Sequence, residues 1–150
     1  MANPLTIIKN DHKKVQALFR EYEDLGDQAM VTKKDIAAQI IAELTQHAEM
    51  EETILYPFLE EKYNKEGDSM VEEAIAEHAV AKNLMSELEA LDPEDPQFDA
   101  KIKVLDENIN HHIKEEEEEL LPKAQKEIPE DELDIVGDQM LAFKGDGYLE

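Results

Sequence analysis

A short motif occurs twice in this chain, 65 residues apart, and this repeat limits the possible folds more than any other feature of the sequence. The segment HAEMEETILYP, which begins at His47, matches the segment HIKEEEEELLP, which begins at His112. Each copy places a glutamate four residues after the histidine and a proline at its end. A motif that recurs at a fixed offset indicates that one structural unit occurs twice. The fold should therefore contain two similar halves.

An earlier part of each half repeats as well. The segment DHKKVQALFREYEDL, from Asp11, aligns with EHAVAKNLMSELEAL, from Glu77, and this alignment places His12 on His78. Apolar residues recur in both segments at the three- and four-residue spacing of an amphipathic helix. Each half is therefore interpreted as one helix pair, with a histidine on its first helix and the HxxxE motif on its second.

Prolines and glycines divide the chain into long stretches with helical periodicity. No stretch alternates with the two-residue period of a β-strand. Long helices joined by short loops predict an all-α, up-down-up-down four-helix bundle. Because Pro57 lies inside the second stretch, we expect a kink or a short break there. The helices are expected at residues 4–25, 33–63, 69–91 and 97–126.

The bundle should occupy residues 1–128 as one domain, since a chain of 150 residues can bury a sizeable core. Asn3 and Pro4 are suited to the N-cap and the first position of its first helix. We expect residues 129–150 to form a short acidic C-terminal extension, made of a short helix and a loose tail.

The chain is strongly acidic, with 38 aspartates and glutamates against 15 lysines and arginines and a formal net charge of −23. Such a surface repels phosphate groups, so nucleic acids and anionic membranes are not expected as partners. The absence of cysteine excludes disulfides, iron–sulfur clusters and thiolate zinc sites, which leaves imidazole and carboxylate groups to hold a metal. Without a long apolar segment or a signal-peptide core, the protein is expected in the cytoplasm.

Four histidines lie on helix faces that should point into the bundle, because each lies three or four positions from an apolar residue of its helix. Glu51 and Glu116 each lie one turn beyond a histidine of the repeated motif, so imidazole and carboxylate share a helix face. Buried imidazoles and carboxylates are costly unless they are paired, and a bound cation would neutralise the carboxylates. The pattern therefore predicts a metal site formed by His12, His47, Glu51, His78, His112 and Glu116.

The order His, HxxxE, His, HxxxE, together with the LYP and LLP ends of the two motifs, resembles the hemerythrin-like (HHE cation-binding) domain family over residues 8–126. The resemblance implies a non-haem centre of two iron ions inside the bundle. Mixed imidazole and carboxylate ligands also suit iron better than zinc or manganese. It further implies terminal ligation by His12, His47, His78 and His112, and bridging by Glu51 and Glu116.

The chain departs from the oxygen-carrying hemerythrins, which have one more ligand histidine on the third helix. The positions one turn from His78 hold Ala74 and Lys82, and His111 should point toward the surface. About four positions on two six-coordinate irons then stay open for an oxo or hydroxo bridge, water, a substrate or a further side chain. Possible further ligands are Tyr56, Tyr22 and Glu43, and Gln16 and Lys82 could cover the open positions.

Three functions remain open from the sequence. The first is a di-iron protein that senses or reacts with a small oxidant, namely O2, peroxide or nitric oxide, whether as an enzyme, a sensor or a carrier. The second is non-redox storage or buffering of iron or zinc, and the third is a metal-free acidic bundle that binds a basic partner. Open coordination positions favour the first, because an incompletely ligated metal can react.

Overall fold

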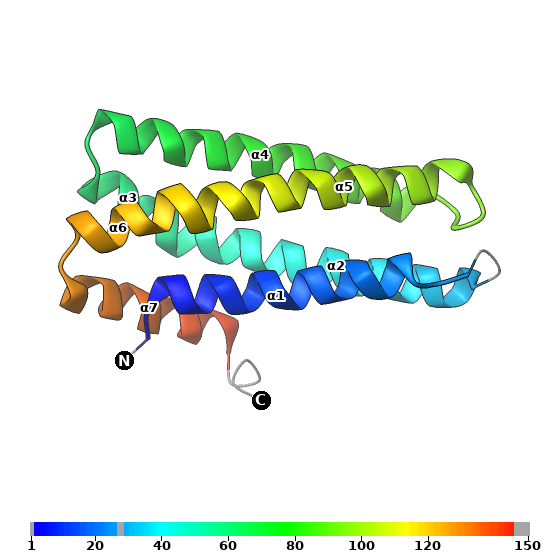
Figure 1. Cartoon of the computed structure of the whole chain (residues 1–150), viewed down its shortest axis with the longest axis horizontal. Coiled ribbons are helices and arrows are strands. Elements are labelled where there is room, and N and C mark those ends of the chain that lie inside the picture. Colours follow the sequence, from blue (N-terminus) through cyan, green and yellow to red (C-terminus); the bar gives the residue numbers. More distant parts are fainter. Residues whose placement is uncertain (1, 27–28, 146–150) are drawn as a thin grey trace.

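Four long helices run side by side in alternating directions, which confirms the predicted up-down-up-down bundle (Figure 1). The computed structural model describes residues 2–26 and 29–145. Asn3 caps the first helix as expected, since its side chain accepts a hydrogen bond from the backbone N–H of Leu5, and Pro4 takes the first helical position. The long helices are α1 (Pro4–Glu23), α2 (Met30–Met50), α4 (Lys65–Ala90) and α5 (Pro96–Glu115).

The helix α4 begins at Lys65, four residues before the predicted start. Asn64 caps it by accepting a hydrogen bond from the N–H of Gly67. Gly67 therefore lies in the first turn of α4, although glycines were expected to separate the helices. A Cβ at this position would lie 2.5 Å from the Tyr63 side chain, so the glycine allows Tyr63 to pack closely against α4.

A π-helical turn precedes the proline of each repeated motif, where only a kink or a break at Pro57 was predicted. The turn η1 (Glu51–Leu55) leads into α3 (Tyr56–Lys62), and η2 (Glu116–Leu120) leads into α6 (Leu121–Glu127). Because proline has no N–H to donate, the chain tolerates a wider turn just before it. The N–H of the next residue, Tyr56 or Leu121, bonds instead to the carbonyl of the glutamate that opens the turn.

The C-terminal segment is more ordered than the predicted short helix and loose tail. The helix α7 (Glu130–Lys144) packs along α1 and also contacts α2 and η1. It buries Leu133, Val136 and Met140 toward the bundle. Residues 146–150 of the expected tail lie outside the described residues, and the domain boundary at residue 128 stays a prediction.

Two apolar clusters fill the bundle, and a layer of histidines and glutamates separates them. Along α1, Ile7 and Ile8 belong to one cluster and Val15 and Phe19 to the other, with His12 between them. The same order occurs on α2 and α4, whereas α5 packs in the second cluster and the chain reaches the first cluster in η2 and α6. The apolar packing on both sides therefore holds this polar layer at a fixed height in the bundle.

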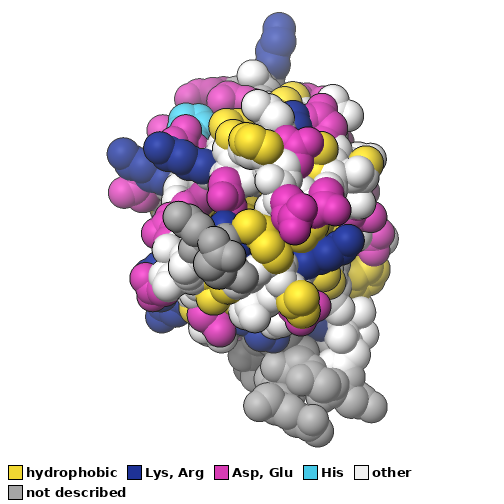
Figure 2. All heavy atoms as spheres, turned by 90° about the vertical axis from the view of Figure 1, so that its right-hand side faces the viewer, with side chains coloured by type: hydrophobic (Ala, Val, Ile, Leu, Met, Phe, Trp, Pro, Cys, Tyr) yellow, Lys and Arg dark blue, Asp and Glu magenta, His cyan; other side chains and the backbone are white. Residues whose placement is uncertain are grey.

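The outer surface carries the excess of acidic groups. Figure 2 shows aspartates and glutamates spread over one end of the bundle, among basic and hydrophobic side chains. Within the described part of the chain, no helix combines the length and the apolar character that crossing a membrane requires.

Replacing Gly137 with alanine is expected to destabilise the fold by about 1–3 kcal/mol through overpacking. A Cβ at Gly137 would lie 2.2 Å from the backbone oxygen of Ala2, so α7 would have to move away from the N-terminus. Urea unfolding measures the effect. Gly26→Ala is the matched control, because nothing lies within 4 Å of a Cβ there. Equal stability of the two variants would contradict the close approach of α7.

Candidate metal centre

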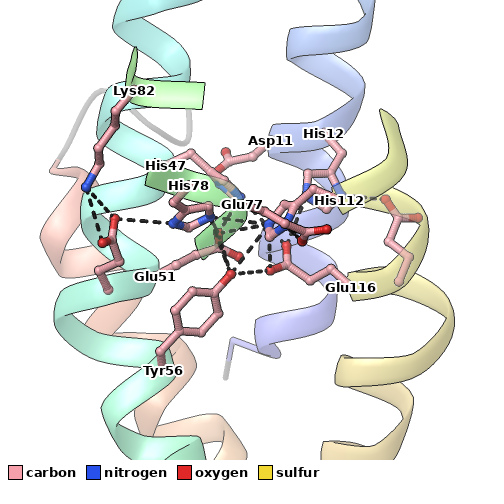
Figure 3. Close-up of polar contacts among 12 residues, drawn as sticks. Asp11, His12, His47, Glu51, Tyr56, Glu77, His78, Lys82, His112 and Glu116 are labelled. Atoms are coloured by element: carbon pink, nitrogen blue, oxygen red, sulfur yellow. Dashed lines mark hydrogen bonds and ion pairs between the residues drawn. The ribbon is translucent and has the colours of Figure 1, made fainter. Parts of the chain in front are cut away.

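Six buried side chains point toward one another in the polar layer of the bundle (Figure 3). They come from all four long helices and from the two π-helical turns. All six residues singled out from the sequence are brought together here. Their possible ligand atoms form two groups, within each of which the atoms lie within 4.8 Å of one another: His12, His47 and Glu116, and Glu51, His78 and His112.

The two glutamates lie between the two groups of imidazoles. Glu116 places Oε1 at 3.1 Å from Nε2 of His12 and Oε2 at 3.3 Å from Nε2 of His112. Glu51 places Oε1 at 3.3 Å from Nε2 of His47 and at 3.0 Å from Nε2 of His78. Each carboxylate therefore faces one imidazole from each half of the chain. This arrangement is suited to carboxylates shared by two cations.

The π-helical turns explain how Tyr56 reaches the same place. Each turn opens with its glutamate, and the wider turn rotates the following residues relative to an α-helix. The Tyr56 hydroxyl donates to Glu116 Oε2 at 2.8 Å and can also donate to Glu51 Oε1 at 3.1 Å. The repeat places Leu121 at the equivalent position of the other half, so the two halves of the centre differ there.

The other residues considered as further ligands lie elsewhere. Tyr22 donates a hydrogen bond to Asp99 near the far end of the bundle, and Glu43 faces Lys14 on the surface. Gln16 bonds Asn110 at 3.4 Å and does not cover the centre.

Each of the four buried histidines also has an acidic partner at its second ring nitrogen, a feature missed in the sequence analysis. A carboxylate at Nδ1 fixes the ring and leaves Nε2 free for a cation. The repeat carries the signal, because an acidic residue precedes the first histidine in both halves and a second glutamate follows the HxxxE motif in both. The Nδ1 contacts are His47–Asp11 at 2.6 Å, His112–Glu77 at 2.8 Å, His12–Glu117 at 2.5 Å and His78–Glu52 at 3.2 Å.

Charges at the centre stabilise each other. Burial disfavours charged imidazoles, but Glu51 and Glu116 outweigh burial and raise the pKa of His47 and His112. Burial and the charge of Glu116 likewise oppose ionisation of Glu51, yet His47 and His112 lower its pKa to about 2. The pKa of Glu116 is also lowered, since His112 and other hydrogen-bond partners outweigh its burial. The centre is thus a buried cluster of carboxylates that positive charge must compensate.

The residues fit a bound metal. Nε2 of His47 and Oε2 of Glu51 are buried and have no hydrogen-bond partner among residues 2–26 and 29–145, although buried polar atoms are normally satisfied. Both atoms belong to the six-residue cluster and are typical ligand atoms for a first-row transition metal. A cation within the cluster would satisfy both of them.

A small cavity of about 30 Å³ lies beside the imidazoles. Apolar side chains such as Val15, Leu44, Met85 and Ile113 form much of its wall, and the four buried histidines of the centre also line it. Its size suits a molecule of two or three atoms.

Lys82 also lines this cavity, as expected, but its ammonium group bonds the Glu52 carboxylate at 2.9 Å and is half exposed. His111 points to the surface as predicted, and it contacts Glu115 at 2.9 Å and Glu77 at 3.5 Å. Ala74 is part of the apolar core. The positions one turn from His78 therefore add no further imidazole or carboxylate to the centre.

Comparison with known proteins agrees with this geometry. Residues 3–124 match the family described as the Hemerythrin HHE cation binding domain. A "DNA nickase" of Nostoc sp. is 30% identical over 138 residues, and an uncharacterized hemerythrin-like protein of Schizosaccharomyces pombe is 28% identical over 125 residues. These alignments cover 92% and 83% of this chain but only 38% and 61% of the relatives, so the chain spans part of their length.

A solved structure shares the fold. It is a Hemerythrin HHE cation binding domain-containing protein from Mycobacterium kansasii, which is 22% identical to this chain and has a TM-score of 0.80. The superposition covers 95% of this chain and 85% of that protein. At this identity the comparison supports the shared helical fold and nothing further.

Proposed function

Because the chain belongs to the hemerythrin HHE cation-binding domain family, we propose that it holds two iron ions at this centre and reacts with a small oxidant. The oxidant would be O2, hydrogen peroxide or nitric oxide, and the protein would act in the cytoplasm. Iron is proposed over zinc or manganese because imidazole and carboxylate donors with open positions suit it. The proposed ligands are His12 and His47 for one ion and His78 and His112 for the other, with Glu51 and Glu116 shared by both ions.

The observation that carries the proposal is that two buried atoms, His47 Nε2 and Glu51 Oε2, form no hydrogen bond within the described part of the chain. A purely structural cluster would leave both atoms without a hydrogen bond, at a cost of about 1–3 kcal/mol each. The small cavity beside the imidazoles adds a second argument, because it provides room for a small molecule next to the proposed ions.

The protein groups have separate roles in this proposal. Bound iron supplies redox chemistry and Lewis acidity. The outer carboxylates keep the Nε2 atoms turned inward, and the apolar wall of the cavity excludes bulk water. Burial and the charges of Glu116 and Glu51 raise the pKa of Tyr56, so its hydroxyl keeps its proton and donates to the carboxylates. A phenol in this state acts as a hydrogen-bond donor at the centre.

Metal analysis combined with absorption spectroscopy tests the proposal. Protein from iron-rich medium should contain about two irons per chain, as six ligands in two groups require. Its near-ultraviolet and visible absorption should change on addition of hydrogen peroxide. Protein that contains no metal after such growth would contradict the proposal.

Non-redox storage or buffering of iron or zinc is the nearest alternative. It requires the same ligands but no reaction at the open positions. Exchangeable metal, an unchanged spectrum with peroxide and no peroxide consumption would favour storage. Steady peroxide consumption by the iron-loaded protein would exclude it.

Cleavage of DNA is suggested by the name of the Nostoc relative, but we propose that this chain does not act on nucleic acid. This chain matches only 38% of that protein, and its net charge of −23 repels phosphate at every approach. Supercoiled plasmid incubated with the iron-loaded protein should therefore stay intact to the same extent as in buffer. Nicking by the unaltered protein, together with no nicking by the Glu116→Ala variant, would overturn this expectation.

Metal binding should release protons and should strengthen as the pH rises. The raised pKa values of His47 and His112 mean that metal-free protein carries protonated imidazoles above pH 6.5. These protons stabilise the metal-free fold fully below about pH 6.5, and the stabilisation is lost as the pH rises through the raised pKa. A cation must displace them, so we expect about two protons per chain at pH 7.

An anaerobic titration with ferrous iron in the presence of a pH indicator measures the release. The variant His111→Ala is the control, because this imidazole is exposed and lies outside both ligand groups. It should release as many protons as the unaltered protein. Metal uptake without proton release would contradict the expectation.

A further inference from the structure

The last residue of α7 turns its charged side chain into the molecule. Nζ of Lys144 lies 2.6 Å from Oδ2 of Asp11, and the lysine side chain is only 2% exposed. An ammonium group at a helix end normally reaches solvent, because its burial is costly. The helix that carries it lies beyond residues 3–124, the part that matches the family. The lysine of this buried ion pair therefore lies outside the residues that match the family.

Asp11 connects this lysine to the metal centre. The same oxygen, Oδ2, lies 2.6 Å from Nδ1 of His47. The other oxygen of Asp11 is buried without a hydrogen-bond partner in the described part of the chain. The orientation of the carboxylate thus depends on Lys144 and His47, and the line of contacts runs from α7 through α1 to a proposed ligand on α2.

The other half of the repeat lacks this arrangement. Glu77 is the equivalent of Asp11 and contacts Nδ1 of His112, but its side chain is more exposed, at 15% against 4%. On its other side, the Glu77 carboxylate contacts the exposed imidazole of His111, with Oε2 at 3.5 Å from Nε2. The two halves therefore hold their equivalent ligand histidines with different rigidity.

We propose that Lys144 is a positioning residue of the metal centre: by holding Asp11 it holds the His47 ring, and so α7 tightens one of the two metal positions. This inference rests on the proposed metal function. Loss of the ammonium group would leave the Asp11 carboxylate buried with one partner, and the carboxylate would turn away toward water. The imidazole of His47 would then lose the contact that keeps Nε2 aimed at the centre.

The variant Lys144→Met tests this, because it keeps the length and the apolar stem of the side chain. Titration with ferrous iron should show one of the two metal equivalents weakened about 10- to 100-fold, the range found for lost outer partners of ligand histidines. The second equivalent should bind as in the unaltered protein. Asp11→Asn should give the same pattern, and the double variant should be no worse than either single variant.

A spectroscopic reading on metal-free protein separates positioning from simple loss of stability. With ¹⁵N-labelled histidine, the Nδ1 proton of His47 should exchange slowly in the unaltered protein and quickly in Lys144→Met. Lys101→Met is the matched control, since Lys101 forms an ion pair with Glu87 at 2.6 Å on the bundle surface. The control should leave both the proton exchange and the two metal affinities unchanged.

The outcomes distinguish this inference from the proposed function. Unaltered protein that takes up no metal would refute the proposed function, while the exchange of the His47 proton would still test the link to Lys144. Unaltered protein that binds two irons, with Lys144→Met unchanged in affinity and exchange, would overturn this inference alone. Equal weakening of both equivalents with an unchanged His47 proton would also overturn it, because α7 would then support only the fold.

Discussion

Glu116→Ala is expected to remove both metal ions from the protein, whereas His78→Ala should remove one. The Glu116 carboxylate faces both groups, with Oε1 at 3.1 Å from Nε2 of His12 and Oε2 at 3.3 Å from Nε2 of His112. Loss of this carboxylate removes a proposed ligand atom from each of the two metal positions. Loss of the His78 imidazole affects one group, since its Nε2 lies at 3.0 Å from Glu51 and belongs to that group alone.

The expected weakening for Glu116→Ala exceeds the 10- to 100-fold that loss of an outer partner typically causes, so affinity should fall by more than about 100-fold at both positions. Metal content after dialysis against buffer measures the result for each variant. Glu118→Ala is the control, because it removes an exposed glutamate from the same π-helical turn. Two irons retained by Glu116→Ala would contradict the shared-carboxylate geometry.

The bundle and the meeting of the six side chains were predictable because both follow from repetition and helical period. A duplicated histidine on one helix face and a duplicated HxxxE on the next must converge when the two halves pack together. Their role as metal ligands stays a proposal. The outer carboxylates were predictable in principle, since Asp11 and Glu77 occupy equivalent places in the repeat.

The π-helical turns were not predictable from the same reasoning. A period of 3.6 residues describes the α-helix, and Pro57 indicates a disturbance without indicating whether the turn narrows or widens. The choice among Tyr56, Tyr22 and Glu43 depends on this, because the wider turn is what brings the Tyr56 hydroxyl to the two glutamates. Only the three-dimensional structure selects Tyr56.

The packing of α7 was missed for a different reason. Its first turn is acidic, and the apolar face formed by Leu133, Val136 and Met140 at helical spacing was overlooked. Gly137 lies on the same side and permits close contact with the N-terminus. The buried Lys144 gives no signal in the sequence, because a lysine at a helix end normally stays in solvent.

Removal of the metal should lower the melting temperature by roughly 10–20 °C. Each ion present at 100 times its dissociation constant adds about 2.7 kcal/mol of stability. Two ions thus add about 5 kcal/mol, and a domain of this size shifts by about 2–4 °C for each kcal/mol. The effect should be large because the centre separates the two apolar clusters, so every long helix contributes a side chain to it.

Calorimetry of iron-loaded protein with and without a chelator measures this difference. The gap should widen as the pH rises from 6 to 8, because displacing a proton from an imidazole then costs less free energy. Over the same range the metal-free fold loses part of the stabilisation that protonated His47 and His112 provide. The variant Glu116→Ala should melt at the same temperature with and without chelator. Equal melting temperatures of loaded and chelated unaltered protein would show that the six side chains are satisfied without a cation. The lack of a hydrogen bond to His47 Nε2 and Glu51 Oε2 among the described residues argues against this.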